Sequence, residues 1–171
     1  MIAIRPETKE DFPAITQIID AAFGQSSEGR LVENLRRNKK FIAQLSLVAL
    51  YNHERVGHVL FFPIMINNQR SEYESLALAP VAVLPERQRM GVGFALIRQG
   101  LTACREEGFR SVIVLGHPEY YPRFGFQKAS RWKISAPFDV PDEAFMAIEL
   151  EKDALRNIQG VVQYPEEFNH V

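Results

Sequence analysis

The sequence predicts an α/β (α+β) domain built on one mixed, mostly antiparallel central sheet with helices packed against it. Three features of the chain lead to this prediction. Two amphipathic helical patterns follow a short β-type run at the start, three β-rich runs joined by short turns come next, and a strand–helix–strand unit follows them. This last unit predicts a parallel pair of strands with a right-handed crossover, because a parallel connection needs about the length of a helix.

The composition is that of an ordinary soluble protein. A chain of 171 residues, 46% hydrophobic and 24% charged, is long enough to bury a sizeable core, so residues 1–171 are expected to form a single domain. The net charge of −1 favours neither nucleic acid nor an anionic membrane as a partner. One cysteine, Cys104, excludes an intrachain disulfide, and no signal peptide or membrane-spanning run is visible, so a cytoplasmic location is expected.

The first part of the chain has the pattern of a strand and two helices. After a β-type run at residues 1–5, residues 12–23 place apolar side chains at three- and four-residue spacing. Thr8 with Asp11 is close to a capping box in front of them. Residues 28–40 repeat the helical pattern more weakly, and their basic end is interpreted as a solvated helix terminus, where cations suit the helix dipole. This end contains Arg36, Arg37, Lys39 and Lys40.

Three β-rich runs then predict an antiparallel meander. Residues 45–51 and 55–66 are joined by a three-residue turn, a spacing typical of a hairpin, and residues 71–83 follow a second turn. His58 alternates with apolar neighbours and is interpreted as a residue of a sheet face. Pro80 has no N–H to donate to a sheet ladder, so we expect an interrupted pair that leaves backbone groups free for a ligand.

Residues 94–107 form the clearest helical pattern of the chain, with Gly108 in the position of a C-cap. Its apolar stripe contains Phe94, Ile97, Leu101 and Cys104. Residues 111–115, which are continuously apolar after the first serine, are expected to form a strand buried on both faces. Beyond it we expect a short helix or turn at 119–124, a strand that starts at 125–126, and strands at 145–150 and 161–164.

The loop that precedes this helix has the properties of an anion site. Residues 88–93 read QRMGVG and connect a strand to a helix N-terminus. The first amides of a helix have no intrahelical acceptor and carry partial positive charge, and glycine lets a ligand approach the backbone closely. Arg87 and Arg89 add positive charge, so the loop is suited to a phosphate or a pyrophosphate.

Two motifs in this order resemble a known family. QxxGxG at residues 88–93 resembles the acyl-CoA signature of the GCN5-related N-acetyltransferase (GNAT) superfamily, and YxRFGF at residues 121–126 resembles its tyrosine-bearing segment. The order of strands and helices is also similar. The resemblance covers residues 1–130, the motif-bearing core, whereas residues 131–171 are expected to form C-terminal strands and a loop on the substrate side.

The resemblance implies a sheet with a splayed parallel strand pair, helices on both faces, and acetyl-CoA as co-substrate without a metal. The pyrophosphate would lie on the loop amides, and the pantetheine arm would pair with the strand in front of the loop. The cofactor-binding residues expected from the resemblance are Val81, Ala82, Val83, Gln88, Arg89, Met90, Gly91, Val92, Gly93 and Phe94.

The implied reaction is direct transfer of the acetyl group to a primary amine of a small molecule or a peptide. Tyr121 occupies the family's position for the general acid: a phenol with a pKa near ~10 is protonated at neutral pH and donates to a departing thiolate, whose thiol has a pKa near ~8.5. The base stays open between His117, Glu74 with its neighbour Glu72, and a chain of water molecules. A backbone N–H near Val83 would stabilise the oxyanion.

Other functions fit the sequence less well. A dinucleotide site of the Rossmann type needs a third glycine where this chain has Leu96. The chain lacks both the His and Cys spacing of a metal site and the GxSxG motif of a serine hydrolase. The alternative is a non-catalytic acyl-CoA-binding module of the same fold. An interaction protein, or a homodimer paired through its C-terminal strands, also stays open. The acceptor pocket is expected from residues 23–37 and 130–145.

Overall fold

The computed structural model describes residues 1–171 and divides them into two compact units. The first unit contains residues 1–62, 79–103 and 166–171, and the second contains residues 63–78 and 104–165. Strands β3 (Glu54–Asn67) and β4 (Glu72–Val83) each contribute one part to either unit.

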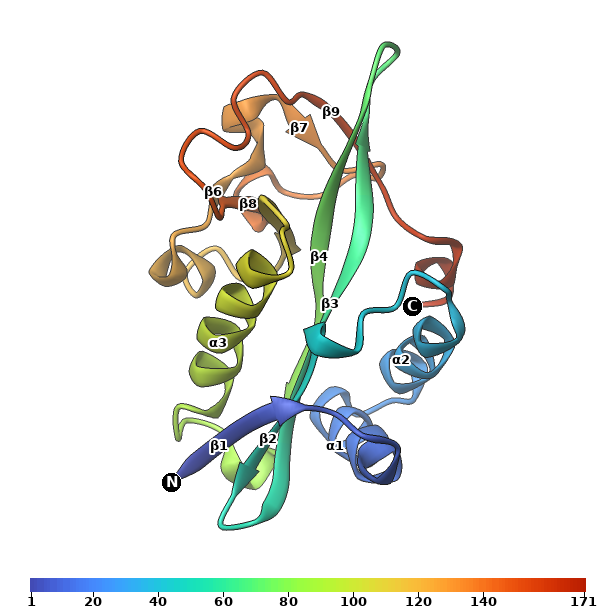
Figure 1. The fold of residues 1–171 in the computed structure, drawn as a ribbon, viewed down its shortest axis with the longest axis vertical. Helices are drawn as coiled ribbons and strands as arrows, with labels where there is room; N and C mark the ends of the chain where they lie inside the picture. Colours follow the sequence, from blue (N-terminus) through green and yellow to red (C-terminus); the bar gives the residue numbers. More distant parts are fainter. The chain divides into compact units, whose positions relative to one another are not determined.

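The first unit is a sheet of strands in the order β1-β2-β3-β4 with helices on both of its faces. In Figure 1, helices α1 and α2 lie on one side of these strands and α3 lies on the other. Strand β2 is antiparallel to both of its neighbours, with Ala49 opposite Ile4 and Val48 opposite His58. The elements are β1 (Ile2–Pro6), α1 (Phe12–Phe23), α2 (Ser27–Arg37), β2 (Ser46–Tyr51) and α3 (Val92–Glu106).

Alternation along β3 gives each face of this sheet its own core. Leu60 and Phe62 are buried against α1 and α2, whereas Phe61, which lies between them, packs against α3. The core on the side of α1 and α2 consists of Ile15, Ile18, Ile19, Leu31, Val32, Leu35, Val48, Leu60, Phe62 and Ala82. This arrangement confirms the predicted placement of helices on both faces.

Helix α3 lies very close to β3 because glycines occupy the contact. A Cβ atom placed on Gly100 would lie 2.3 Å from Cε1 of Phe61. A Cβ atom on Gly57 would lie 2.9 Å from Cγ1 of Val92 and 3.0 Å from Cδ1 of Leu96. Real Cβ contacts are longer, so any side chain at either position would push the helix and the strand apart.

In the second unit, β4 pairs with β5 (Ser111–Leu115) in parallel, with Ala77 opposite Ile113. This is the parallel pair that the strand–helix–strand pattern predicted. Strand β5 is also antiparallel to β8, which in turn pairs with β6, and β9 pairs with the second part of β3 and with β7. The remaining strands are β6 (Gln127–Lys128), β7 (Ile134–Ser135), β8 (Phe145–Glu149) and β9 (Gly160–Gln163).

The predicted elements occur with small differences in their ends. Helix α2 ends at Arg37, three residues before the predicted end. Helix α3 begins at Val92, two residues before the predicted start, because Val92 is buried against Gly57 and forms part of the first turn. The pattern had placed Phe94 on the buried stripe, but its side chain is 41% exposed and lies off that stripe. No helix of the chain has both the length and the apolar character that a membrane span requires.

The predicted ends of two helices are confirmed in their hydrogen bonds. The Thr8 N–H donates to Oδ2 of Asp11 at 2.7 Å, as in a capping box, at the start of a short 3₁₀ helix (Lys9–Asp11) that leads into α1. Gly108 has φ +89°, its N–H donates to the carbonyl of Arg105 at 3.0 Å, and the next N–H donates to the carbonyl of Cys104 at 3.1 Å. These two bonds are those of a Schellman motif.

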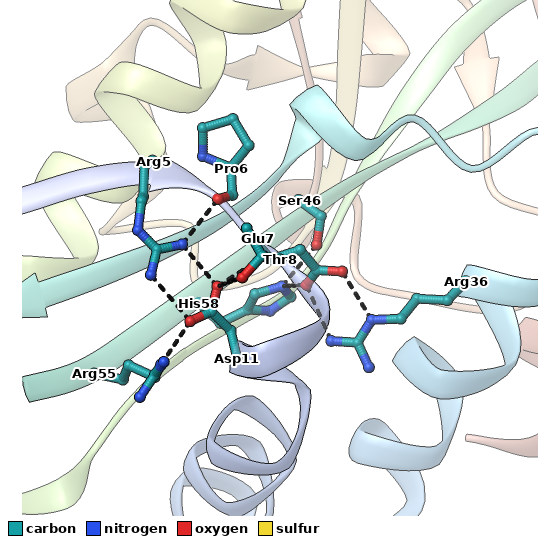
Figure 2. Close-up of polar contacts among 9 residues, drawn as sticks. All are labelled: Arg5, Pro6, Glu7, Thr8, Asp11, Arg36, Ser46, Arg55 and His58. Atoms are coloured by element: carbon teal, nitrogen blue, oxygen red, sulfur yellow. Dashed lines mark hydrogen bonds and ion pairs between the residues drawn. The ribbon is translucent and has the colours of Figure 1, made fainter.

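A buried polar cluster joins the corner between β1 and α1 to α2, β2 and β3 (Figure 2). Glu7 accepts hydrogen bonds from Nε and Nη2 of Arg36, at 2.8 and 3.0 Å, and contacts Nε2 of His58 at 3.2 Å. Ser46 Oγ lies 2.8 Å from the same ring nitrogen. The interpretation of Arg36 as a solvated helix end was wrong: its side chain is 9% exposed, and its guanidinium lies 3.8 Å from the ring centroid of Phe12.

The two acids of this corner are held ionised. Burial raises the pKa of Glu7, but hydrogen bonds from His58 and Arg36 outweigh it and lower the pKa to about 2. Oδ2 of Asp11 lies 2.7 Å from Nη1 of Arg5, and its Oδ1 lies 2.6 Å from Nε of Arg55, so its pKa also lies well below the ordinary value. Burial lowers the pKa of His58, which keeps the ring neutral.

Replacing Gly100 with alanine should destabilise the protein. Alanine gains about 1 kcal/mol of helix propensity over glycine, but overpacking against Phe61 costs typically about 1–3 kcal/mol, so we expect a net loss of about 1 kcal/mol. Urea denaturation followed by circular dichroism measures the change. Gln99→Ala, an exposed position of the same helix, is the control and should not be destabilising. Equal or greater stability of Gly100→Ala would contradict the packing described for α3.

The buried polar cluster around Glu7 predicts a specific dependence of stability on pH. A carboxyl whose pKa falls from 4.5 to about 2 on folding stabilises the protein above pH 4.5, and this contribution disappears as the pH falls toward 2. Its size is on the order of 3 kcal/mol. We therefore expect Glu7→Gln to be less stable than the parent protein at pH 7, with a difference that shrinks between pH 4.5 and pH 2.

Glu10→Gln, an exposed carboxyl of the same segment, is the control for this titration. Free energies of unfolding from urea titrations at a series of pH values give both differences. A Glu7→Gln difference that stays constant down to pH 2 would show that the carboxyl gains no stability from its charge.

Candidate functional site

The last residues of β4 form the edge of the first unit's sheet. Within that unit β4 is the outermost strand, next to β3. The earlier part of β4, which belongs to the second unit, pairs with β5 at a single position, Ala77 with Ile113. Ala82 is buried in the core, whereas Val81 and Val83 are partly exposed. An edge strand presents backbone N–H and C=O groups that have no strand partner, so this edge can bind an extended amide-containing ligand.

The loop after β4 is held by hydrogen bonds at its start. The Leu84 N–H donates to the carbonyl of Val56 at 2.9 Å, and Nε2 of Gln88 donates to the carbonyl of Val83 at 3.2 Å. The predicted loop entry, Gln88, therefore closes the loop back onto the strand. Farther on, Arg89 and Gly91 both adopt left-handed backbone conformations, with φ of +66° and +85°.

The loop leads directly into the exposed N-terminus of α3. The first intrahelical hydrogen bond runs from the Ala95 N–H to the carbonyl of Gly91, at 3.0 Å. The N–H groups of Val92 and Gly93 lie in the turn before it and have no intrahelical acceptor. Gly91 is exposed, and no other group lies within 4 Å of the position of a Cβ atom there. The N-terminus is thus open to an anionic ligand.

Of the two arginines near this loop, one is already paired. Nη2 of Arg87 lies 3.3 Å from a carboxylate oxygen of Glu54, and its guanidinium lies 5.0 Å from the ring centroid of Tyr51. No local pattern indicates this pairing, because Glu54 is 33 residues away. Arg89 and Met90 are exposed beside the open amides, so Arg89 carries the positive charge that the loop was expected to have.

Tyr121 is held in the second unit, in a short 3₁₀ helix (Tyr121–Phe124) after β5. It is 7% exposed, and its ring makes edge contacts with Tyr120 and Phe126, at centroid distances of 5.1 and 5.7 Å. Burial raises its pKa to about 12, so the phenol is protonated at neutral pH. The Tyr121 hydroxyl is therefore protonated, and the contacts with Tyr120 and Phe126 hold its ring in one orientation.

The structure brings His117 close to Tyr121 but does not bring Glu74 there. The carbonyl of His117 accepts the Tyr121 N–H at 3.4 Å, and its side chain is exposed. Glu74 is also exposed, but the pairing of Ala77 with Ile113 places it level with Arg110, before β5 begins. His117 and Tyr121 follow the other end of β5, which is roughly 20 Å away along the strand.

The segments expected at the acceptor side contribute residues to a groove and to an aromatic pair. A groove of about 480 Å³ lies between α1 and α2. It is lined by Phe12, Pro13, Thr16, Glu33, Arg36 and Arg37. In the second unit, Phe138 stacks on Tyr164 with a centroid distance of 6.1 Å and remains 48% exposed. Nearby, Lys128 and Asp142 form an exposed ion pair at 3.8 Å.

The Ser46, His58 and Glu7 side chains do not form a hydrolase triad, although they are the residue types of one. A triad places the serine on one ring nitrogen of the histidine and the acid on the other. Here both contact Nε2, and Nδ1 is buried without a partner. His58 is 0% exposed, so no substrate reaches the ring. The cluster is a structural one.

Comparison with known proteins identifies a family and several relatives. Residues 3–129 match the family model described as an acetyltransferase (GNAT) domain. The chain is 40% identical over 136 residues to the N-acetyltransferase YjhQ of Escherichia coli, and this match covers 79% of this chain and 75% of that protein. It is 32% identical over 167 residues to the E. coli N-acetyltransferase YhbS, with 97% and 98% of the two chains covered.

Two solved structures are similar over nearly the whole chain. The crystal structure of YhbS from E. coli in complex with CoA has a TM-score of 0.90 and 31% identity, and the match covers 98% of this chain and 92% of that chain. A GNAT family acetyltransferase from Brucella melitensis, crystallised in complex with acetyl-CoA, has a TM-score of 0.79 and 34% identity, with 98% of each chain covered.

Proposed function

The chain belongs to the GNAT family of N-acetyltransferases, as its two motifs predicted, and we propose that it transfers the acetyl group of acetyl-CoA to a primary amine of a small molecule or a peptide. The observation that carries the proposal is the open N-terminus of α3, which follows the free edge of β4 within the residues that match the family. CoA and acetyl-CoA in the two similar crystal structures support the choice of cofactor.

The proposed binding mode uses backbone groups more than side chains. The pyrophosphate accepts hydrogen bonds from the amides of the loop and of the first turn of α3, and Arg89 adds a positive charge. The pantetheine amides pair with the edge of β4 at residues 81–83, as an added strand would. The proposed cofactor residues remain Val81, Ala82, Val83, Gln88, Arg89, Met90, Gly91, Val92, Gly93 and Phe94.

The proposed chemistry is a single acyl transfer. The neutral amine attacks the thioester carbon, a C–N bond forms, and the carbonyl oxygen becomes an oxyanion that a backbone N–H near Val83 stabilises. The C–S bond then breaks. The amine loses a proton to a base. The Tyr121 phenol donates its hydrogen to the sulfur while the C–S bond breaks, and a proton from solvent completes the thiol. The products are the N-acetylated amine and CoA as the free thiol.

His117 and water are the groups we propose for the base. His117 is exposed and lies four residues before Tyr121, so an imidazole, which can accept a proton, is available next to the acid. Glu74 lies at the other end of β5 from Tyr121, which disfavours it. An α-amine with a pKa near ~8 needs little help from a base, whereas a lysine amine needs more.

A panel of amines tests the proposed activity. The purified protein is incubated with acetyl-CoA and single amines, including polyamines, amino acids and short peptides with free N-termini, and the release of CoA thiol is followed by absorbance. Mass spectrometry then identifies the acetylated amine. Saturable binding of CoA without thiol release from any amine would support the binding module instead of the enzyme.

Tyr121→Phe should lower kcat on a reactive amine by about 10²-fold or more, because general acid catalysis typically contributes 10²–10⁴-fold. The Kd for CoA, measured by calorimetry, should change little. Tyr120→Phe is the matched control, since it removes the hydroxyl of the adjacent ring and should leave kcat within about twofold. An unchanged kcat for Tyr121→Phe, with acyl transfer shown to limit the rate, would remove Tyr121 from the mechanism.

Gly91→Ala should weaken the binding of CoA. Position 91 has φ +85° and open space for a methyl group, so alanine meets only the backbone cost of the left-handed conformation, about 1–2 kcal/mol, and the loop relaxes away from its binding geometry. We expect a Kd for CoA that rises roughly 5- to 30-fold. Calorimetric titration measures it.

Gly108→Ala is the matched control for this substitution. Position 108 lies just beyond the other end of α3 with φ +89° and equally open space. Alanine there should cost similar stability and leave the Kd for CoA unchanged. Equal losses of CoA affinity in both variants would mean that general destabilisation, and not the loop geometry, sets the affinity.

A further inference from the structure

We propose that Gly116 is a positioning residue for this reaction: because it has no side chain, the ring of Tyr121 lies directly against the backbone that follows β5. This inference rests on the proposed role of Tyr121 as the acid. Gly116 belongs to neither of the two motifs, and the sequence alone marks it only as a glycine before the His117-Pro118 turn.

The contact leaves no space for a methyl group. A Cβ atom on Gly116 would lie 2.3 Å from Cε2 of Tyr121, 2.9 Å from Cδ2 and 3.3 Å from Cζ. They form one edge of the ring, and Cζ is the atom that bears the hydroxyl. The glycine is not required for backbone conformation, because its φ is not in the left-handed region that Gly108 and Gly125 occupy. What the position requires is the absence of a side chain.

Neither partner can move away easily. The Gly116 N–H donates to the carbonyl of Ala144 at 2.9 Å, which ties this backbone to the segment before β8. On the tyrosine side, Phe126 and Tyr120 contact the ring at their edges, and the Tyr121 N–H is bonded to the carbonyl of His117. A methyl group at position 116 must therefore displace the ring by about 1 Å, a misplacement that can cost on the order of 10²-fold in rate.

A double-mutant cycle on kcat tests the inference. The four proteins are the parent, Gly116→Ala, Tyr121→Phe and the double variant, each assayed with acetyl-CoA and the same amine. We expect Gly116→Ala to lower kcat by roughly 10- to 100-fold with the Kd for CoA within about twofold. In the Tyr121→Phe background, Gly116→Ala should cause no further loss, because a ring without a hydroxyl has no acid to misplace.

Gly100→Ala is the matched control, since it places a methyl group equally close to an aromatic ring, that of Phe61, in the other unit. Any effect it has on kcat should be the same in both backgrounds. The inference is overturned if Gly116→Ala retains the parent kcat, or if it lowers kcat equally with Tyr and with Phe at position 121. These outcomes differ from failure of the proposed function, in which the parent protein releases no thiol with any amine. They also differ from failure of Tyr121 as the acid, in which Tyr121→Phe itself keeps the parent kcat.

If Gly116→Ala is too unstable for kinetics, its effect on Tm reports on the same contact. The loss of Tm caused by Gly116→Ala should largely disappear in a Tyr121→Ala background, where the ring that the methyl group meets is gone. An equal loss of Tm in both backgrounds would mean that the methyl group meets something other than this ring, and the inference would fail.

Discussion

The close contact between α3 and β3 is the constraint on which the binding edge depends. At Gly57 and Gly100 the helix and the strand approach so closely that only hydrogen fits between them. Gly57 meets both Val92, in the first turn of α3, and the backbone carbonyl of Ala82, which lies 3.2 Å from the position of a Cβ atom. One contact therefore fixes the open amides of the helix relative to the free edge of β4. A ligand that binds to both needs this fixed spacing, because two weak sets of backbone hydrogen bonds add up only when neither must be reorganised.

The regular elements could be predicted because their signals are local. The spacing of apolar residues in α1, the turn between β2 and β3, and the glycine after α3 each act over a few residues. The start of α3 was placed two residues late for the same reason: the glycines on either side of Val92 look like loop residues, and only the burial of Val92 against Gly57 brings Val92 and Gly93 into the helix. The motif residues of the loop could be proposed as a site from the sequence because anion-binding chemistry also depends on consecutive residues.

The interactions that the sequence did not reveal join residues that are far apart. Nothing in the pattern of α2 indicates that Arg36 is buried, because its partner Glu7 lies 29 residues away on another element. The pairing of Arg87 with Glu54 was missed for the same reason. A buried carboxylate is costly unless cations and donors surround it, so these long-range pairs constrain the fold strongly while leaving no periodic signal. Gly116 is a further case, since its importance comes from the ring of Tyr121 and not from its own backbone conformation.

The burial of Tyr121 has two opposite consequences for the proposed reaction. It keeps the phenol protonated, but a pKa of about 12 also makes the phenol a weak acid. Against a thiol with a pKa near ~8.5, complete transfer of the proton to the free thiolate would be uphill by about 5 kcal/mol. The phenol therefore acts best as a hydrogen-bond donor while the C–S bond is breaking, before a free thiolate exists. A donor that acts in this way depends on distance and angle more than on acidity. This is the reason to expect that a residue which only holds the ring in place, as we infer for Gly116, affects the rate through the hydroxyl group.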